Sequence, residues 1–236
     1  MTPRIQYRDV HKAFGSNRVL QGVTLDVAKG ESMVIIGGSG TGKSVALKCV
    51  LGLVRPDRGE ILVDGAPQGR DRDAFLARFG MLFQGGALFD SLTIWQNVAF
   101  RLLQGRQRLA KEEARAIAIE KLRRVGLRES VADQFPAELS GGMQKRVGLA
   151  RAIAAEPEII FFDEPTTGLD PIMSGVINDL IREIVVEMGA TAMTITHDMS
   201  SVRAIADKVA MLHAGVVQWT GPIADLEHSG DPYLDQ

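Results

Sequence analysis

The chain has 236 residues, of which 45% are hydrophobic and 24% are charged. These proportions are typical of a globular protein with a buried core, and they exclude a disordered or fibrous chain. The 27 basic residues nearly balance the 29 acidic ones, so nucleic acid is not an expected partner. The single cysteine, Cys49, excludes an internal disulfide. Residues 1–9 lack the apolar segment of a signal peptide, and we expect the chain to stay in a reducing cytoplasm.

The N-terminal part of the chain predicts strands leading into one helix. The first thirty residues alternate apolar and polar positions, which indicates an antiparallel sheet. A short apolar run at 33–36 predicts a buried strand, and residues 44–53 predict a helix. Two further strands are predicted at 59–65 and 80–83.

Helical periodicity replaces the strand pattern between residues 89 and 156. Apolar residues spaced by three or four positions predict one helix over 114–125 and another over 143–154. Pro157 ends the second helix, because proline disfavours the helical conformation in the residue before it.

The last third of the chain returns to strands and helices in alternation. Residues 158–162 and 191–196 are continuous apolar or β-branched runs, which are typical of parallel strands covered on both faces. Between them, Asp170 is suited to cap a helix that begins at Pro171. The alternation predicts an α/β core.

The clearest motif connects the strand at 33–36 to the helix that follows it. It has the form Gly, four free positions, Gly-Lys-Ser, in the strand-then-helix context of a phosphate-binding loop. Its glycines let backbone amides point at phosphates, and the helix N-terminus adds positive potential. We expect Lys43 to reach the terminal phosphates and Ser44 to hold Mg²⁺. The expected nucleotide-binding residues of this segment are Gly37, Gly38, Ser39, Gly40, Thr41, Gly42, Lys43, Ser44 and Val45.

Two adjacent carboxylates follow the apolar run at 158–162. Their position predicts that Asp163 lies beside Mg²⁺ and that Glu164 orients or deprotonates the attacking water. The phosphate-binding loop alone leaves kinases, GTPases and ATPases open. No Asn-Lys-x-Asp element of a guanine-specific GTPase is present, and a metabolite kinase would give Glu164 no role.

The segment Leu139-Ser140-Gly141-Gly142-Met143-Gln144 resembles the signature motif of ABC-transporter ATPases, and the other motifs have the order and spacing of that family over nearly the whole chain. The resemblance implies a P-loop NTPase with a RecA-like parallel-sheet core, an N-terminal antiparallel β subdomain and an inserted α-helical subdomain. It predicts one ABC ATPase domain over residues 1–236. The catalytic core would comprise 1–88 and 157–236, and the helical part 89–156.

In that family the signature motif of one subunit closes over the ATP bound to a second subunit, which implies a head-to-tail homodimer. Ser140 would then offer a hydroxyl to the γ-phosphate of the partner's ATP. Gly141 and Gly142 would allow close backbone approach, and the following helix would direct its positive end toward that phosphate.

The resemblance also assigns residues whose roles are not evident from their type alone. Gln84 resembles the Q-loop glutamine, which contacts Mg²⁺ and senses the membrane partner. His197 resembles the switch histidine that binds the γ-phosphate, and Asp170 belongs to a segment similar to the D-loop at the dimer interface. Phe14 aligns with the aromatic residue that stacks on adenine, with Tyr7 as the alternative.

Residues 81–100 and 138–172 resemble the branch of the family that drives phospholipid transport between bacterial membranes, the Mla/Mce type. The features that carry this resemblance are the segment 85–89 (GGALF) and Met143 in the signature motif. The resemblance implies multispanning permease subunits, a periplasmic lipid-binding subunit with MCE domains and, in some systems, a STAS-domain protein. The ATPase would lie on the cytoplasmic face of the bacterial inner membrane.

Two other functions remain open. The ATPase of a solute importer, for amino acids for example, would keep all nucleotide-binding residues and differ only in the groove that receives the permease. That groove would include Phe89 and Trp95.

A soluble ABC protein of DNA repair or translation is disfavoured, because only 56 positions separate Gln84 from Ser140, too few for a long coiled-coil insertion.

Overall fold

The computed structural model describes residues 2–67, 71–104, 108–228 and 230. The strands are β1 (Ile5–Phe14), β2 (Asn17–Val27), β3 (Ser32–Ile36), β4 (Arg58–Val63), β5 (Ala66–Pro67), β6 (Phe79–Leu82), β7 (Ile159–Asp163), β8 (Thr191–Ile195), β9 (Lys208–His213) and β10 (Val216–Pro222). The helices are α1 (Lys43–Val50), α2 (Arg72–Ala77), α3 (Ile94–Val98), α4 (Lys111–Arg124), α5 (Gly141–Ile153), α6 (Pro171–Met188) and α7 (Met199–Ile205), with 3-10 helices η1 (Glu129–Val131), η2 (Pro136–Glu138) and η3 (Ile223–His228).

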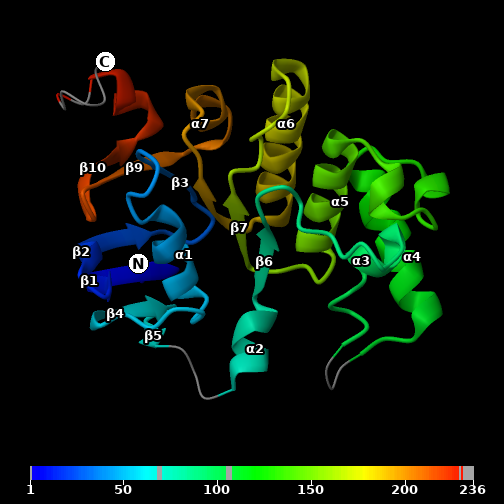
Figure 1. Cartoon of the computed structure of the whole chain (residues 1–236), viewed down its shortest axis with the longest axis horizontal. Helices are drawn as coiled ribbons and strands as arrows, with labels where there is room; N and C mark the ends of the chain where they lie inside the picture. Colours follow the sequence, from blue (N-terminus) through cyan, green and yellow to red (C-terminus); the bar gives the residue numbers. More distant parts are fainter. Residues whose placement is uncertain (1, 68–70, 105–107, 229, 231–236) are drawn as a thin grey trace.

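A smaller, antiparallel sheet contains the N-terminal strands in the order β2-β1-β4-β5. Its strands β1 and β2 pair along most of their length, for example Tyr7 with Leu25. The alternating pattern of the first thirty residues therefore produces the predicted sheet, with one face buried and one face toward water. Figure 1 shows α1 next to this sheet.

The larger sheet has the order β10-β9-β3-β8-β7-β6. Strands β6, β7, β8, β3 and β9 run parallel to their neighbours, and β10 closes the edge as an antiparallel hairpin with β9. The carboxyl ends of the parallel strands lie together at one edge of the sheet, which is where ligands bind in folds of this kind. The phosphate-binding loop leaves β3 at that edge.

The continuous apolar runs of β3 and β7 are explained by burial on both faces. Alternate residues of each strand pack into two different hydrophobic clusters. One cluster contains Val34 and Phe162 together with residues of α4, α5 and α6. The other contains Met33 and Phe161 together with residues of α1 and the antiparallel sheet. The molecule is therefore layered, with the parallel sheet between the antiparallel sheet and a group of helices.

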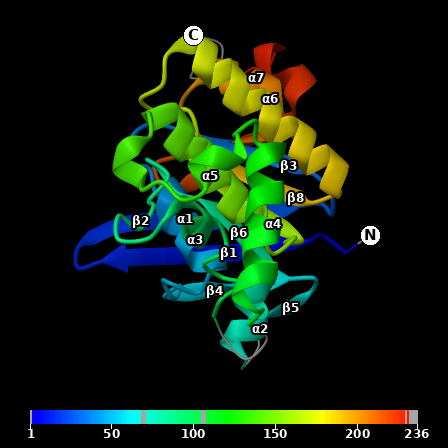
Figure 2. The same ribbon diagram turned by 90° about the vertical axis from the view of Figure 1, so that its right-hand side faces the viewer.

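Helices α3, α4 and α5 of the predicted helical subdomain lie on one side of the molecule, at the right in Figure 1 and toward the viewer in Figure 2. Helix α5 packs against α3, α4 and β6, so it connects the helical part to the larger sheet. Asp170 precedes helix α6 and caps it, because its carboxylate accepts a hydrogen bond from the Met173 backbone N–H at 2.9 Å, as predicted. Within the described residues, no helix combines the length and apolarity needed to cross a membrane.

Candidate functional site

A cleft of about 640 Å³ lies at the edge of the large sheet where its parallel strands end. The phosphate-binding loop and the start of α1 form one wall, and the segments that follow β6, β7 and β8 contribute to the rest. The cleft is lined by Phe14, Val19, Ser39, Gly40, Thr41, Gly42, Lys43, Ser44, Val45, Gln84, Asp163, Glu164, Ile195 and His197. Twelve of these residues were predicted to bind nucleotide or Mg²⁺ or to act in catalysis. Val19 and Ile195 were not.

The phosphate-binding loop has a conformation that requires glycine. At Gly37 φ is +150°, and a Cβ atom there would come within 2.2 Å of the Leu212 carbonyl oxygen. Gly37 and Gly38 do not line the cleft. Their carbonyl oxygens accept hydrogen bonds from Lys43 Nζ at 2.6 and 2.8 Å. The structure thus fixes the Lys43 ammonium inside the loop, where burial lowers its pKa and Glu164 and Asp163 oppose that shift.

The two adjacent carboxylates both face the cleft. Asp163 is the last residue of β7, and Glu164 adopts a left-handed conformation with φ of +50°. Burial, followed by the charge of Glu164, raises the pKa of the Asp163 carboxyl, while Lys48 and Lys43 act in the opposite direction. Ser44 and Asp163 supply oxygen atoms, the ligands that Mg²⁺ prefers, so the donor set of the cleft fits this cation.

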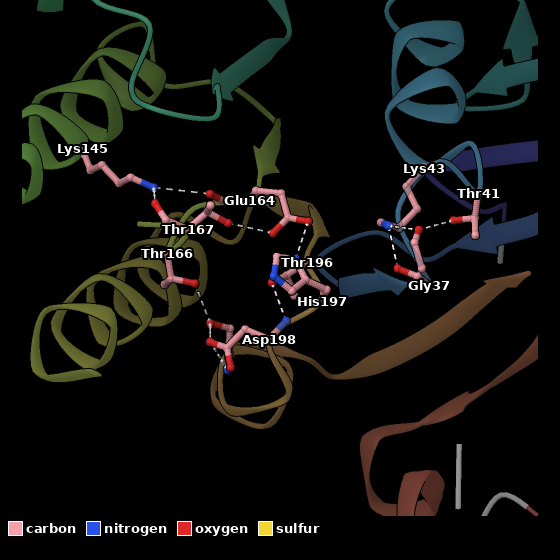
Figure 3. A network of polar contacts seen from close by, with 12 residues as sticks. Gly37, Thr41, Lys43, Lys145, Glu164, Thr166, Thr167, Thr196, His197 and Asp198 are labelled. Atoms are coloured by element: carbon pink, nitrogen blue, oxygen red, sulfur yellow. Dashed lines mark hydrogen bonds and ion pairs between the residues drawn. The ribbon is translucent and has the colours of Figure 1, made fainter. Parts of the chain in front are cut away.

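The Glu164 carboxylate is held by two side chains. Thr167 Oγ1 donates a hydrogen bond to one carboxylate oxygen at 3.0 Å, and His197 Nδ1 lies 3.0 Å from the other (Figure 3). The Glu164 backbone N–H also donates to the Ile195 carbonyl oxygen at 2.9 Å, which ties the end of β7 to β8. The carboxylate therefore has a defined position in the cleft.

The structure separates the two candidates for adenine stacking. Phe14 lines the cleft and is 50% exposed, with Lys12 Nζ 5.3 Å above its ring. Tyr7 is fully buried, and its hydroxyl donates to the Ala46 carbonyl oxygen at 3.2 Å. Tyr7 therefore cannot contact a ligand in the cleft, and the Tyr7 alternative is wrong.

The predicted signature residues do not line this cleft. Ser140 caps α5, its hydroxyl accepting a hydrogen bond from the Met143 N–H at 3.3 Å. A Cβ atom on Gly141 would meet nothing within 4 Å, whereas one on Gly142 would approach Met173 Cε to 2.9 Å. Asp170 also lies outside the cleft and caps α6. The sequence motifs thus form two separate groups on a single chain.

Three residues near these motifs were not predicted to matter. Thr167 contacts the Glu164 carboxylate, and Lys145 donates to backbone carbonyls around Glu164. Arg151 donates to the carbonyl oxygens of Gly86 and Ala87, which follow Gln84. Lysine and arginine on a helix usually lie in solvent, so residue type gives no signal for Lys145 or Arg151. Thr167 has one weak signal, its position three residues after a carboxylate in a turn.

Comparison with known proteins identifies the family. Residues 20–167 match the ABC transporter family, which is more than half of the chain. The chain belongs to this family. Its ABC ATPase fold agrees with the predicted fold class, and the cassette binds and hydrolyses ATP.

Curated relatives of this ABC ATPase differ in what their names say they transport. The chain is 41% identical to the probable ribonucleotide transport ATP-binding protein mkl of Mycobacterium leprae, over 98% of this chain and 67% of the relative. It is 38% identical to the chloroplastic protein TRIGALACTOSYLDIACYLGLYCEROL 3 of Arabidopsis thaliana, over 98% of this chain and 72% of the relative. The methionine import ATP-binding protein MetN of Mesorhizobium japonicum is 42% identical, over 96% of this chain and 62% of the relative. The ABC ATPase spans about two thirds of the length of these proteins.

Solved ABC cassettes have the same fold. The dimeric ATP-binding cassette MJ0796, in a post-hydrolysis state bound to ADP and Pi, superposes with a TM-score of 0.83 at 32% identity. The match covers 93% of this chain and 98% of that one.

Proposed function

We propose that this ABC ATPase supplies the energy for phospholipid transport between the inner and outer membranes of a bacterium, from the cytoplasmic face of the inner membrane. The observation that carries the proposal is the segment 85–89 (GGALF) after Gln84, together with 38% identity over 98% of the chain to a relative named for a galactolipid. The proposed partners are multispanning permease subunits, an MCE-domain lipid-binding subunit and, in some assemblies, a STAS-domain protein.

The cleft gives each end of the nucleotide a binding surface. Phe14 would stack on the adenine, and the backbone of the phosphate-binding loop would hold the phosphates, with Lys43 at their terminal end. Ser44, Gln84 and Asp163 would hold Mg²⁺. Bound Mg²⁺ would neutralise phosphate charge and polarise a phosphoryl oxygen.

Glu164 is the proposed base for the attacking water. Its carboxylate lies in the cleft beside Asp163, and Thr167 and His197 hold it from either side. A base in a fixed orientation can accept the proton of a water placed between it and the γ-phosphate. His197 is 68% exposed, so it can also turn toward the γ-phosphate as a hydrogen-bond donor.

A second copy of the chain would complete the site. Ser140, Gly141 and Gly142 lie outside the cleft, and Gly141 has open space where a side chain would be. A head-to-tail homodimer would bring these residues to the γ-phosphate of the partner's ATP, with Asp170 at the interface. The N-terminus of α5 would then contribute positive potential to that phosphate.

Phe89 is the proposed contact with the permease. It is 43% exposed, and its ring packs 4.5 Å from that of Phe100. Asn97 hydrogen-bonds both the N–H and the carbonyl oxygen of Phe89, at 2.7 and 3.0 Å, so the backbone behind the exposed ring is fixed. Trp95, the other residue proposed for this groove, is half-buried and packs against the core.

The alternative substrate is an amino acid. The MetN relative is as similar to this chain as the others, and the nucleotide-binding residues do not distinguish an importer from a lipid transporter. The two proposals differ in the membrane proteins that accompany the ATPase.

The test is to purify tagged Glu164→Gln protein with ATP from its native membranes and to identify the associated proteins and lipids by mass spectrometry. A permease with an MCE-domain protein and phospholipid is the expected result. A permease with a solute-binding protein would establish the importer, and the absence of any membrane protein would overturn both proposals. Phe89→Asp should lose the permease and keep its nucleotide affinity. Phe135→Asp, at a similarly exposed phenylalanine, is the matched control and should keep the permease.

A further inference from the structure

Lys145 is a buried lysine on the signature helix α5. It is 5% exposed, and its Nζ donates hydrogen bonds to three backbone carbonyl oxygens of the segment that follows β7. The acceptors are the oxygens of Glu164 at 3.4 Å, Pro165 at 2.9 Å and Thr167 at 2.7 Å. Figure 3 shows Lys145 beside Glu164 and Thr167. Lys145, a side chain of the helical part of the molecule, is thus hydrogen-bonded to the segment 164–167, which contains the proposed base.

All three hydrogen bonds of the Lys145 ammonium go to backbone carbonyl oxygens. In the part of the chain that the structure describes, no ion pair joins its ammonium to a carboxylate. An ammonium group has three N–H donors, and the three carbonyls use all of them. A buried cation is costly unless its hydrogen bonds are satisfied, so moving the segment 164–167 away from α5 would leave the Lys145 charge without acceptors.

The restraint extends from the backbone to the Glu164 carboxylate. Thr167, whose carbonyl oxygen accepts the shortest of the Lys145 hydrogen bonds, donates its own hydroxyl to Glu164 Oε2 at 3.0 Å. The Thr167 N–H also donates to the Glu164 carbonyl oxygen at 3.3 Å, which closes the turn. Movement of Lys145 would therefore shift the Glu164 carboxylate through a single intervening residue, Thr167.

We propose that Lys145 is a positioning residue that couples the signature helix α5 to the Glu164 carboxylate through Thr167. The proposal rests on the proposed role of Glu164 as the base. Because Ser140 caps the same helix five residues earlier, contact of Ser140 with a partner's nucleotide would be transmitted to Glu164 over little more than one helical turn.

A double-mutant cycle tests this coupling. Lys145→Met removes the ammonium and keeps an unbranched side chain. We expect it to lower kcat about tenfold, since small misplacement of a catalytic group is costly, and to leave KM for ATP within about twofold. In the Glu164→Gln background, the same substitution should lower kcat no further, because the group that it positions has already lost its function. Lys121→Met is the matched control. Lys121 is also a buried lysine, but it pairs with Glu120 and Glu156, and its loss should leave kcat unchanged.

Three results would overturn the coupling. Wild-type kcat in Lys145→Met would show that the carbonyl contacts do not matter for turnover. An equal loss in the wild-type and Glu164→Gln backgrounds would show that Lys145 acts independently of Glu164. Near-normal turnover of Glu164→Gln alone would overturn both the proposed base and the coupling. The first two results would overturn the coupling and leave the proposed base intact.

Thr167 provides a second test that does not depend on a buried residue. Thr167 is exposed, so Thr167→Val should fold normally while losing the hydroxyl that holds Glu164. We expect a loss of kcat similar to that of Lys145→Met, with recovery in Thr167→Ser, which keeps the hydroxyl. Equal kcat in Thr167→Val and the wild type would contradict the route through Thr167, and failure of Thr167→Ser to recover would show that the hydroxyl is not the cause.

Discussion

Replacement of Glu164 by glutamine separates the position of this side chain from its basicity. Glutamine has the same length, and its amide oxygen can still accept the hydrogen bond that Thr167 Oγ1 donates at 3.0 Å. The side chain should therefore stay in the cleft, and only its ability to take a proton is lost. Removal of a positioned general base costs about 100-fold or more in rate, which corresponds to about 2.7 kcal/mol in the activation free energy.

The assay is single-turnover release of phosphate from ATP, combined with a direct measurement of ATP affinity. We expect Glu164→Gln to bind ATP as tightly as the wild type and to release phosphate at least about 100-fold more slowly. Glu158→Gln is the matched control, because Glu158 precedes β7 at the opposite end of the strand and pairs with Arg4 and Arg78. Phosphate release by Glu164→Gln within a few-fold of the wild-type rate would refute the assignment of Glu164 as the base.

Three further predictions concern the binding surface of the cleft. Lys43→Ala should weaken ATP binding about tenfold or more, the size of a lost charge-assisted hydrogen bond, and an unchanged Kd would contradict the phosphate-binding role. Phe14→Ala should weaken ATP binding about tenfold, since base stacking contributes about 1–3 kcal/mol, whereas Tyr7→Phe should leave the Kd unchanged because Tyr7 is buried. The raised pKa of Asp163 means that its carboxyl takes up a proton at a higher pH than an ordinary aspartate. The Mg²⁺ concentration that gives half-maximal turnover should therefore rise as the pH falls, and a value independent of pH in Mg²⁺ titrations would contradict the metal role of Asp163.

The central strands could be predicted because burial on both faces leaves continuous apolar runs. The runs predicted at 158–162 and 191–196 became β7 and β8, displaced by no more than one residue at either end. Helix α2 could not be predicted, because its six residues are too few to show a helical repeat, and its only two large apolar residues, Phe75 and Leu76, are adjacent in the sequence and only partly buried against the core. The two apolar runs on either side of Gly215 are typical of a hairpin, and they form β9 and β10.

The cleft was largely predictable because its residues belong to short motifs with fixed spacing. The choice between Phe14 and Tyr7 was not, because both lie on β1 and only burial against α1 distinguishes them. The contacts of Lys145 could not be predicted from the sequence either. They join residues about twenty positions apart through backbone carbonyls, and a backbone acceptor has no residue type that a sequence pattern could reveal.

The left-handed conformation of Glu164 explains how two adjacent carboxylates can serve one cleft. In a continuing strand, neighbouring side chains point to opposite faces of the sheet, so Asp163 and Glu164 could not both face the cleft. The positive φ at Glu164 breaks this alternation. A residue with a side chain adopts this conformation at a cost of about 1 kcal/mol, so its surroundings must hold it there. The Glu164 N–H donates to Ile195 on one side, and the carbonyl oxygen accepts from Lys145 on the other. The contacts that we propose for positioning the carboxylate thus also stabilise the backbone conformation that brings it into the cleft.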